Sequence, residues 1–529
     1  MVKSDLLNYI NANIIENDTG SITATKLKTV VTENVKNLLP INEEVVLTDE
    51  EKNNVLSSLG IADEKINLTI KCESAAAILN TAVVTVTYNG KSKDYTWTGS
   101  TLVITIPTMY EYTFKFSNNI KGYNAPESFT NTAKRNRIRN ITVVYDAASY
   151  VDLSYRDTSG NVEDLQETAN CYVIKEAGKY CFPIVYGCAI KGNTLNDGAY
   201  TQVEGTYTKP FYNYLNNQIT SPYIETDTGI DAESVEVILI DNTGYTITDA
   251  YLVRRNICKY VYFEVGEVPA LGGNAIIAVK DGDGQIMWSW HIWAYPGEIY
   301  AIDYTNSNNV VYGWMNVDLG WVKAADGSTY GDCPYYQWGR KDPLMRNYGV
   351  NQILGGVNIN VSDIATSVAS SIQNPQTFYK HTINGTDAST SVNYNWWYDN
   401  GTAVNFYNYW DASTSTAGIS DNSVYKTVYD PCPRGWHVPN GNSFKGVTLS
   451  NIEGSWTNGF TWNGRFFYAV GCRLTLSGSV YGFGSSRYAW YSSSDSAASA
   501  YYMYFNSSAV CAQSADYRAY GFVLCPVRE

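Results

Sequence analysis

The stretch Tyr429-Asp-Pro-Cys-Pro-Arg-Gly-Trp-His-Val-Pro-Asn440 places three prolines, one glycine and one tryptophan within twelve residues. Because proline fixes φ and has no N–H to donate, this stretch cannot be a helix or a central strand. We therefore expect a rigid, irregular loop built around Trp436. The later run Tyr517-Arg-Ala-Tyr-Gly-Phe-Val-Leu-Cys-Pro-Val-Arg528 predicts a terminal strand.

Two further motifs belong with this loop, Tyr335-Tyr-Gln-Trp-Gly-Arg-Lys-Asp-Pro343 and Trp490-Tyr-Ser-Ser-Ser494. Together, and with Gly521 before the last strand, they make residues 296–529 resemble the FISUMP-type domain of Bacteroidetes surface proteins. The resemblance implies a C-type-lectin-like α+β fold, and display and binding rather than chemistry. The sequence departs from the family at Trp314-Met-Asn-Val-Asp-Leu-Gly320, and the calcium-binding tripeptides of sugar-binding C-type lectins are absent.

The composition bounds the remaining possibilities. A chain of 529 residues predicts three or four domains, and its 44% apolar content is ample for several cores. Its 45 tyrosines and 14 tryptophans suit binding surfaces as well as β-rich cores. A net charge of −14 without a basic run argues against nucleic-acid partners. The sequence has no 18-residue apolar run and no apolar segment near Met1, so we expect neither a membrane span nor a secretory signal.

Residues 1–62 show helical rather than strand periodicity. Apolar residues recur at three- and four-residue steps, and Thr23 is a suitable N-cap. Helices this short need a partner for their apolar face, either a sister subunit, a docking protein or the next domain of the same chain. The candidate docking and oligomerisation residues are Ile22, Leu27, Val30, Val31 and Leu38.

The N-terminal segment also resembles phage virion proteins. The stretches Asn8-Tyr-Ile-Asn-Ala-Asn-Ile-Ile15 and Thr19-Gly-Ser-Ile-Thr-Ala-Thr-Lys-Leu-Lys-Thr-Val-Val31 are similar to the start of tail and fibre proteins of Bacteroides phages, including crAss-like phages. Leu47-Thr-Asp-Glu-Glu-Lys-Asn-Asn-Val-Leu-Ser-Ser-Leu-Gly-Ile61 is similar to a helical stem of phage fibres. The resemblance implies assembly in the host cytoplasm into a virion, with capsid, tail or sister fibre chains as partners. A homotrimer is favoured over a dimer.

Residues 66–148 and 149–295 change to period-two patterning, which predicts strands. In the first range Ala82–Tyr88, Thr101–Pro107 and Ile141–Tyr145 are expected strands, and Asn89-Gly90 is a hairpin turn. We expect an Ig-like β-sandwich there.

The range 149–295 predicts a second β-sandwich. Its segment Ala169-Asn-Cys-Tyr-Val-Ile-Lys-Glu-Ala-Gly-Lys-Tyr-Cys-Phe-Pro183 resembles a module found before FISUMP-type domains. Val235–Ile240 and Asn274–Val279 are expected core strands. We expect Met287-Trp-Ser-Trp-His-Ile-Trp293 to fill the core and plug the contact with the next domain.

The sequence offers little for catalysis. None of the three histidines, His291, His381 and His437, has a metal-ligand neighbour at the usual spacing, and we expect no metal site and no cofactor. The ten cysteines predict mainly buried thiols. Asp399 and Asp411 are the carboxylates weighed for a glycan-cleaving enzyme, and a surface role is favoured for both. Asp281-Gly-Asp-Gly284 predicts a hairpin turn rather than a calcium loop.

The candidate binding segments are Asn393-Tyr-Asn-Trp-Trp-Tyr-Asp-Asn-Gly401 and Asn405-Phe-Tyr-Asn-Tyr-Trp410. Aromatic faces stack on sugars or proteins, and asparagine supplies donors and acceptors. The alternative is that these aromatics fill the core of their own domain. The candidate ligand-binding residues, including a second group near residue 490, are Tyr394, Trp396, Trp397, Tyr398, Tyr407, Trp410, Arg487, Tyr488 and Trp490.

The sequence thus predicts a multidomain, mainly β protein with a short N-terminal helical anchor, two Ig-like β-sandwiches and a C-terminal α+β C-type-lectin-like domain. Its expected function is that of a non-enzymatic phage fibre subunit, in a head or tail fibre, which adheres to host surface glycan or protein through residues 296–529. The alternatives are a bacterial fimbrillin-like surface adhesin and a capsule-degrading depolymerase.

Overall fold

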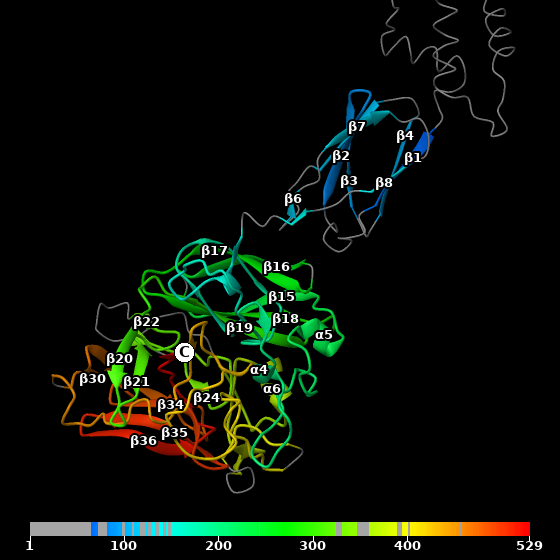
Figure 1. The fold of residues 1–529 in the computed structure, drawn as a ribbon. Coiled ribbons are helices and arrows are strands. Elements are labelled where there is room, and N and C mark those ends of the chain that lie inside the picture. Colours follow the sequence, from blue (N-terminus) through cyan, green and yellow to red (C-terminus); the bar gives the residue numbers. More distant parts are fainter. Residues whose placement is uncertain are drawn as a thin grey trace, which may run out of the picture. The chain divides into compact units, whose positions relative to one another are not determined.

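The structure is a computed structural model. It describes residues 65–71, 82–97, 101–107, 111–116, 123–124, 128–132, 137–140, 144–145 and 150–529, the last range without residues 243, 256, 324–330, 346–358, 389–393, 400–401 and 455. The protein is mainly β, and its chain divides into two compact units, residues 1–147 and 148–529 (Figure 1). The predicted helical anchor at residues 1–62, with its docking residues Ile22, Leu27, Val30, Val31 and Leu38, lies outside the described residues.

The described strands of the first unit form two main sheets, with strand orders β4-β1-β8 and β3-β2-β5-β7, and a short β6-β9 pair. The predicted strands at Ala82–Tyr88 and Thr101–Pro107 are present as β2 and β4, while only Val144–Tyr145 of the third is described. The strands are β1 (Lys65–Lys71), β2 (Val83–Tyr88), β3 (Lys91–Thr96), β4 (Thr101–Pro107), β5 (Glu111–Phe116), β6 (Tyr123–Asn124), β7 (Phe129–Thr132), β8 (Arg137–Asn140) and β9 (Val144–Tyr145).

The hairpin between β2 and β3 has the turn that its sequence predicts. Asn89 and Gly90 adopt φ values of 50° and 68°, which is the left-handed region that a two-residue hairpin turn requires. In β2 the alternate residues Val84 and Val86 are buried, and they lie opposite Phe116 and Phe114 of β5. This alternation gives the sheet one apolar face. The Ig-like topology stays a prediction.

The second unit begins with two four-stranded sheets of order β10-β12-β17-β16 and β11-β19-β18-β15. They pack face to face, since Phe182 of β12 lies 5.1 Å from Tyr172 of β11 and 4.9 Å from Trp290 of β19, measured between ring centroids. The elements are β10 (Val151–Asp152), η1 (Leu153–Tyr155), β11 (Cys171–Ile174), β12 (Gly178–Pro183), β13 (Ile190–Lys191), β14 (Thr194–Leu195), α4 (Asp197–Tyr200), α5 (Ile224–Thr228), β15 (Ser234–Ile240), β16 (Thr246–Arg254), β17 (Lys259–Glu267), β18 (Gly273–Lys280) and β19 (Ile286–Ala294).

Beyond residue 295 the unit holds a four-stranded sheet, β20-β21-β38-β29, and a seven-stranded sheet, β24-β37-β32-β34-β35-β36 with β33 beside β32. Short hairpins and one helix, α6, complete the described part. The elements are β20 (Ala301–Thr305), β21 (Val311–Met315), β22 (Val322–Lys323), β23 (Gly331–Asp332), β24 (Tyr336–Gln337), β25 (Asn360–Ser362), α6 (Val368–Gln373), β26 (Thr377–Tyr379), β27 (Thr382–Ile383), β28 (Thr386–Asp387), β29 (Trp436–His437), β30 (Gly459–Trp462), β31 (Arg465–Tyr468), β32 (Val470–Arg473), β33 (Val480–Phe483), β34 (Ser486–Ser494), β35 (Ser499–Asn506), β36 (Ala509–Tyr517), β37 (Gly521–Phe522) and β38 (Val527–Arg528). The C-type-lectin-like fold stays a prediction.

The proline-rich loop is irregular, as predicted, apart from the two residues of β29. Trp436 is buried in it, and its Nε1 donates to Thr158 Oγ1 at 3.3 Å. The prediction of one terminal strand over residues 517–528 is wrong, because the run divides into the end of β36, then β37 and β38 in two different sheets. Pro526 has no N–H for a ladder, so the strand cannot continue through it.

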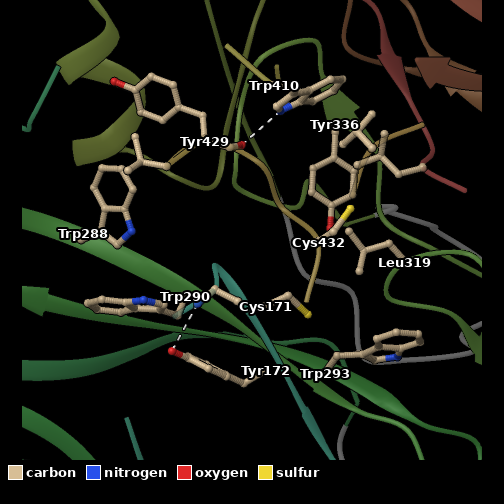
Figure 2. Close-up of a cluster of buried hydrophobic side chains, with 14 of the residues drawn as sticks. Cys171, Tyr172, Trp288, Trp290, Trp293, Leu319, Tyr336, Trp410, Tyr429 and Cys432 are labelled. Carbon is tan, nitrogen blue, oxygen red and sulfur yellow. Dashed lines mark hydrogen bonds between the residues drawn. The ribbon is translucent and has the colours of Figure 1, made fainter. Parts of the chain in front are cut away.

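The core of the second unit crosses the predicted border between residues 295 and 296. The three tryptophans of β19 are fully buried, as expected of a core and a plug. Trp288 stacks on Tyr429 of the proline-rich loop at 6.1 Å between centroids, and Trp293 Nε1 donates to the Trp321 carbonyl at 3.0 Å. Figure 2 shows Trp288, Trp290 and Trp293 with Tyr429 and Trp410, and a dashed line marks the hydrogen bond from Trp410 to Tyr429. The residues on either side of the border therefore share one hydrophobic core.

Among the described residues, no helix combines the length and the apolar character needed to cross a membrane.

Candidate functional site

Most of the predicted aromatic binding residues are buried. Trp396, Trp397, Tyr407 and Trp410 are each at most 5% exposed, while Tyr394 and Tyr398 are half-buried. Trp396 Nε1 donates to the Trp338 carbonyl at 2.7 Å, and Trp410 Nε1 donates to the Tyr429 carbonyl at 3.1 Å. A buried ring has no free face for a ligand, so in this structure the four residues pack the core. Tyr394 instead stacks on Tyr517 at 3.6 Å between centroids.

The second predicted group is also largely internal. Arg487 and Trp490 are completely buried on β34, and Tyr488 between them is half-buried. Arg487 donates from Nη1 and Nη2 to the two carboxylate oxygens of Asp318, at 2.7 and 2.6 Å. Arg465 donates to the same carboxylate at 2.7 Å. Burial alone would raise the pKa of Asp318, but the two guanidinium groups outweigh it and hold the pKa below its usual value.

The two carboxylates weighed for catalysis lie in different settings. Asp411 is buried and caps its own turn, because its side chain accepts from the N–H groups of Ser413 and Tyr425 and from the Ser413 hydroxyl. Asp399 is exposed and pairs through its backbone with Thr402. Asp411 is therefore committed to local structure.

The histidines are core residues. His291, His381 and His437 are each at most 8% exposed, and burial lowers the pKa of each imidazole, in His291 to about 3. His291 Nε2 lies 2.8 Å from Asn274 Oδ1, and His437 Nδ1 lies 2.8 Å from the Val438 carbonyl. Within the described ranges, no three His, Cys, Asp or Glu side chains gather closely enough to hold a metal ion.

The turn predicted at Asp281-Gly-Asp-Gly284 joins β18 to β19 as a hairpin. Asp281 Oδ1 accepts from the N–H groups of Asp283 and Gln285, and Gly284 has a φ of 79°. The other carboxylate oxygen of Asp281, Oδ2, accepts from the Tyr214 hydroxyl at 3.0 Å. These protein partners already occupy the carboxylate.

A pocket of about 310 Å³ lies beside the proline-rich loop. Four segments meet there: residues 167–168, the β13–β14 region, residues 424–434 and the residue after β38. The lining combines charged and polar side chains with apolar surface, and it consists of Glu167, Thr168, Cys188, Ile190, Lys191, Asn196, Val424, Tyr425, Lys426, Arg434 and Glu529. None of the residues predicted as binding sites lines this pocket, so the pocket is a separate candidate site.

Glu529 organises one wall of the pocket. Its carboxylate pairs with Lys191 and, at 3.1 Å, with Lys426, whose ammonium also donates to the Pro433 carbonyl at 3.1 Å. Burial raises the pKa of Glu529, but Lys426 and Lys191 outweigh this effect and lower the pKa to about 2. The backbone N–H of Glu529 donates to the Gly435 carbonyl at 3.0 Å, which fixes the residue against the loop.

Arg434 also lines the pocket and holds the loop to the first part of the unit. It donates to the Leu165 carbonyl at 2.7 Å and to Glu163 at 3.2 Å, and its Nε lies 3.6 Å from Glu167. Glu167 in turn forms an isolated antiparallel bridge with Lys191, so the two side chains are neighbours. Charges of both signs therefore line the pocket in pairs.

Tyr425 stands at the pocket with its residue 43% exposed. Its N–H donates to Asp411 Oδ1 at 2.9 Å, and its hydroxyl donates to Asn196 Oδ1. Asn196 is itself held, because its Nδ2 donates to the Cys188 carbonyl at 2.8 Å. The ring is thus fixed at both ends and half open, which is the arrangement of a preorganised stacking surface.

No protein-family model matches the sequence, and no curated protein matches it. Among solved structures, the chain is similar to a crystal structure of a point mutant of the shaft pilin spaA from Lactobacillus rhamnosus GG, with 13% sequence identity and a TM-score of 0.17. The match covers 50% of this chain and 92% of the pilin chain. A TM-score this low establishes no shared fold.

Proposed function

We propose that the protein is a fibre subunit of a Bacteroidetes phage virion and adheres non-covalently to glycan or protein on the host surface. The observation that carries the adhesive part is the half-exposed, doubly fixed ring of Tyr425 at a charged pocket of about 310 Å³. The virion part rests on the sequence resemblances at residues 8–31 and 47–61. In this proposal the N-terminus docks to capsid, tail or sister chains, and the second unit is the adhesive part.

The settings of Glu529 and Asp411 favour binding over cleavage. A glycosidase needs one carboxylic acid with a raised pKa to protonate the leaving group. Glu529 has its pKa lowered to about 2 by Lys426 and Lys191 and stays ionised. Asp411 is occupied by four donors from Ser413, Thr414 and Tyr425. Neither group is placed to act as such an acid.

The test is binding of the full-length protein to Bacteroides cells with and without capsule. We expect saturable binding to one of the two surfaces, without release of new reducing ends from purified capsule. Reducing ends that accumulate with the wild-type protein and disappear with Asp399→Asn would establish the depolymerase instead. The absence of binding to both kinds of cell would overturn the adhesive function.

A second measurement separates the phage fibre from a bacterial fimbrillin-like adhesin. Antibody raised against residues 150–529 should label virions in an electron micrograph of a phage lysate. Label on the surface of uninfected cells, with none on virions, would support the bacterial adhesin.

A further inference from the structure

We propose that the pocket lined by Glu167, Lys191, Tyr425 and Glu529 takes an uncharged sugar residue that stacks on Tyr425 and exchanges hydrogen bonds with the paired charges. The inference rests on the proposed adhesive function and names the class of ligand.

Each cationic side chain of the pocket already has a carboxylate partner. Lys191 and Lys426 share Glu529, and Arg434 lies 3.2 Å from Glu163 and 3.6 Å from Glu167. An acidic ligand would therefore compete with these carboxylates for the cations, and a basic ligand would compete with the cations for the carboxylates. An uncharged polyol keeps every ion pair, because its hydroxyls both accept from ammonium groups and donate to carboxylates.

The free hydrogen-bonding capacity faces the solvent. Lys191 has three N–H donors, and its side chain is 53% exposed. Its ion pair with Glu529 does not use all three donors, so donors remain for a ligand. Among the described residues, the Glu167 side chain, which is 20% exposed, has an ion-pair contact only with Arg434, at 3.6 Å. Because Glu167 and Lys191 are bridge partners, a donor and an acceptor lie side by side. Such a pair matches two neighbouring hydroxyls of a sugar ring.

The aromatic ring supplies the apolar contact. A pyranose has a face of C–H groups that packs against an aromatic ring, and a ring that is already fixed loses little entropy on binding. The Tyr425 ring is held through its hydroxyl by Asn196. A held ring and paired charges therefore line the same pocket.

The volume limits the ligand. Pockets for small molecules extend from about 300 to about 1,000 Å³, and this one, at about 310 Å³, lies at the lower end. It has room for about one sugar ring rather than for a polysaccharide segment. Recognition would therefore involve a terminal or branching sugar, and adhesion strength would come from many copies on one particle.

The experiment is saturation-transfer NMR with the full-length protein and five monosaccharides. The uncharged probes are D-glucose, D-galactose and N-acetyl-D-glucosamine, and the charged probes are D-galacturonic acid and D-glucosamine. We expect at least one uncharged sugar to bind at millimolar concentration, and to bind at least fivefold more tightly than either charged sugar. Stronger binding of a charged probe, or no binding of any uncharged probe, would overturn the inference.

Two variants of Tyr425 and one control variant locate the site. Tyr425→Ala should weaken sugar binding at least tenfold, and Tyr425→Phe should keep most of it because the ring remains. Tyr481→Ala is the matched control, since Tyr481 is 57% exposed on β33 and does not line the pocket. Unchanged binding in Tyr425→Ala, or equal losses in all three variants, would remove the pocket from consideration. Thermal unfolding of each variant checks that the fold is intact. Lys191→Gln, at an exposed position, is a second variant of the pocket and should weaken sugar binding at least threefold.

The outcome is separable from that of the proposed function. Sugar binding that depends on Tyr425, without any binding to cells, would keep the pocket and reject host adhesion. Equal binding of cells by the wild-type protein and Tyr425→Ala would keep adhesion and reject this pocket as its site.

Discussion

The side chain of Asn170 donates to the backbone carbonyl of Asp430 at 2.8 Å, and the two residues are 260 positions apart in the sequence. The same Nδ2 group donates to the Val428 carbonyl at 2.6 Å, and Asn170 Oδ1 accepts from Trp288 Nε1 at 3.1 Å. Asn170 is 1% exposed. One amide side chain thus joins β19 to the proline-rich loop, and the loop is part of the core of the whole second unit.

Asn170→Ala should lower the free energy of unfolding of the second unit by about 2–4 kcal/mol, because it leaves two buried carbonyls and one indole N–H without partners. Urea unfolding followed by tryptophan fluorescence measures this. Asn217→Ala is the control, since Asn217 is an exposed asparagine of the same unit and should change stability by less than about 0.5 kcal/mol. Equal stabilities of the two variants would show that the Asn170 bridge is not needed.

The shared core predicts that neither half of the second unit folds alone. A fragment of residues 150–295 would expose Trp288 and Trp293, which contact Tyr429 and Trp321 in the intact protein. A fragment of residues 150–529 should give dispersed amide NMR spectra and resist proteolysis, whereas residues 150–295 and 296–529 should each be degraded rapidly. A stable, folded fragment 296–529 would instead support an independent C-terminal domain.

Much of this organisation follows from patterns within one segment. The alternation in β2 and β4, the apolar residues of β15 and β18 and the Asn89-Gly90 turn are local properties, so the sequence predicted them. The burial of Trp288, Trp290 and Trp293 was predicted because three large apolar side chains on one strand are more often buried in a core than exposed to solvent.

The site was harder to predict because its contacts are distant in sequence. Trp396 donates to a carbonyl 58 positions away, and Lys191 pairs with a carboxylate 338 positions away. Loops rich in Tyr, Trp and Asn have the same composition whether they face a ligand or fill a core, so composition alone could not separate the two outcomes. Arg434 lies within the quoted proline-rich motif, and a charged residue at that place was the one local signal for the pocket.

The ion pairs of Glu529 predict a pH dependence. Its pKa is lowered to about 2 in the folded protein, against an ordinary value of 4.5. Between these values the unfolded chain binds more protons at this position, so the free energy of unfolding rises with pH and the contribution is lost as pH falls from about 4.5 to 2. The loss should be on the order of 2 kcal/mol.

Glu529→Gln should remove this part of the pH dependence. Above pH 5 the free energy of unfolding should change with pH in nearly the same way in the variant and in the wild type. Urea unfolding at several pH values measures the difference between the two proteins. The control is Glu233→Gln, at an exposed position, which should follow the wild-type curve. Parallel curves for the wild type and Glu529→Gln across the acid range would contradict the ion-pair assignment.

The described cysteines predict a single reactive thiol in the folded second unit. Cys511 is exposed on β36, and the other eight described cysteines are buried. Burial raises the pKa of thiols such as Cys171 and Cys432, which further suppresses their reactivity. Brief alkylation followed by peptide mapping should modify Cys511 first, and the buried eight only in denaturant. Rapid labelling of Cys432 in the native protein would contradict the packing of the proline-rich loop.

Gly464 and Gly471 have nearly equal φ values, but we expect them to differ in how well they tolerate substitution by alanine. Gly464, at a φ of 73°, lies in the turn between β30 and β31, and an added Cβ would meet nothing within 4 Å. Gly471 of β32 has a φ of 71°, but an added Cβ would lie 2.3 Å from the Tyr481 carbonyl oxygen and 2.8 Å from the Phe483 nitrogen. Gly464→Ala introduces only the strain of a left-handed backbone and should lower the free energy of unfolding by about 1 kcal/mol. Gly471→Ala must also separate β32 from β33 and should lower it by about 3 kcal/mol or more. Thermal and urea unfolding of the two variants give the comparison, and similar losses in both would mean that the close approach of β33 to Gly471 does not exist in solution.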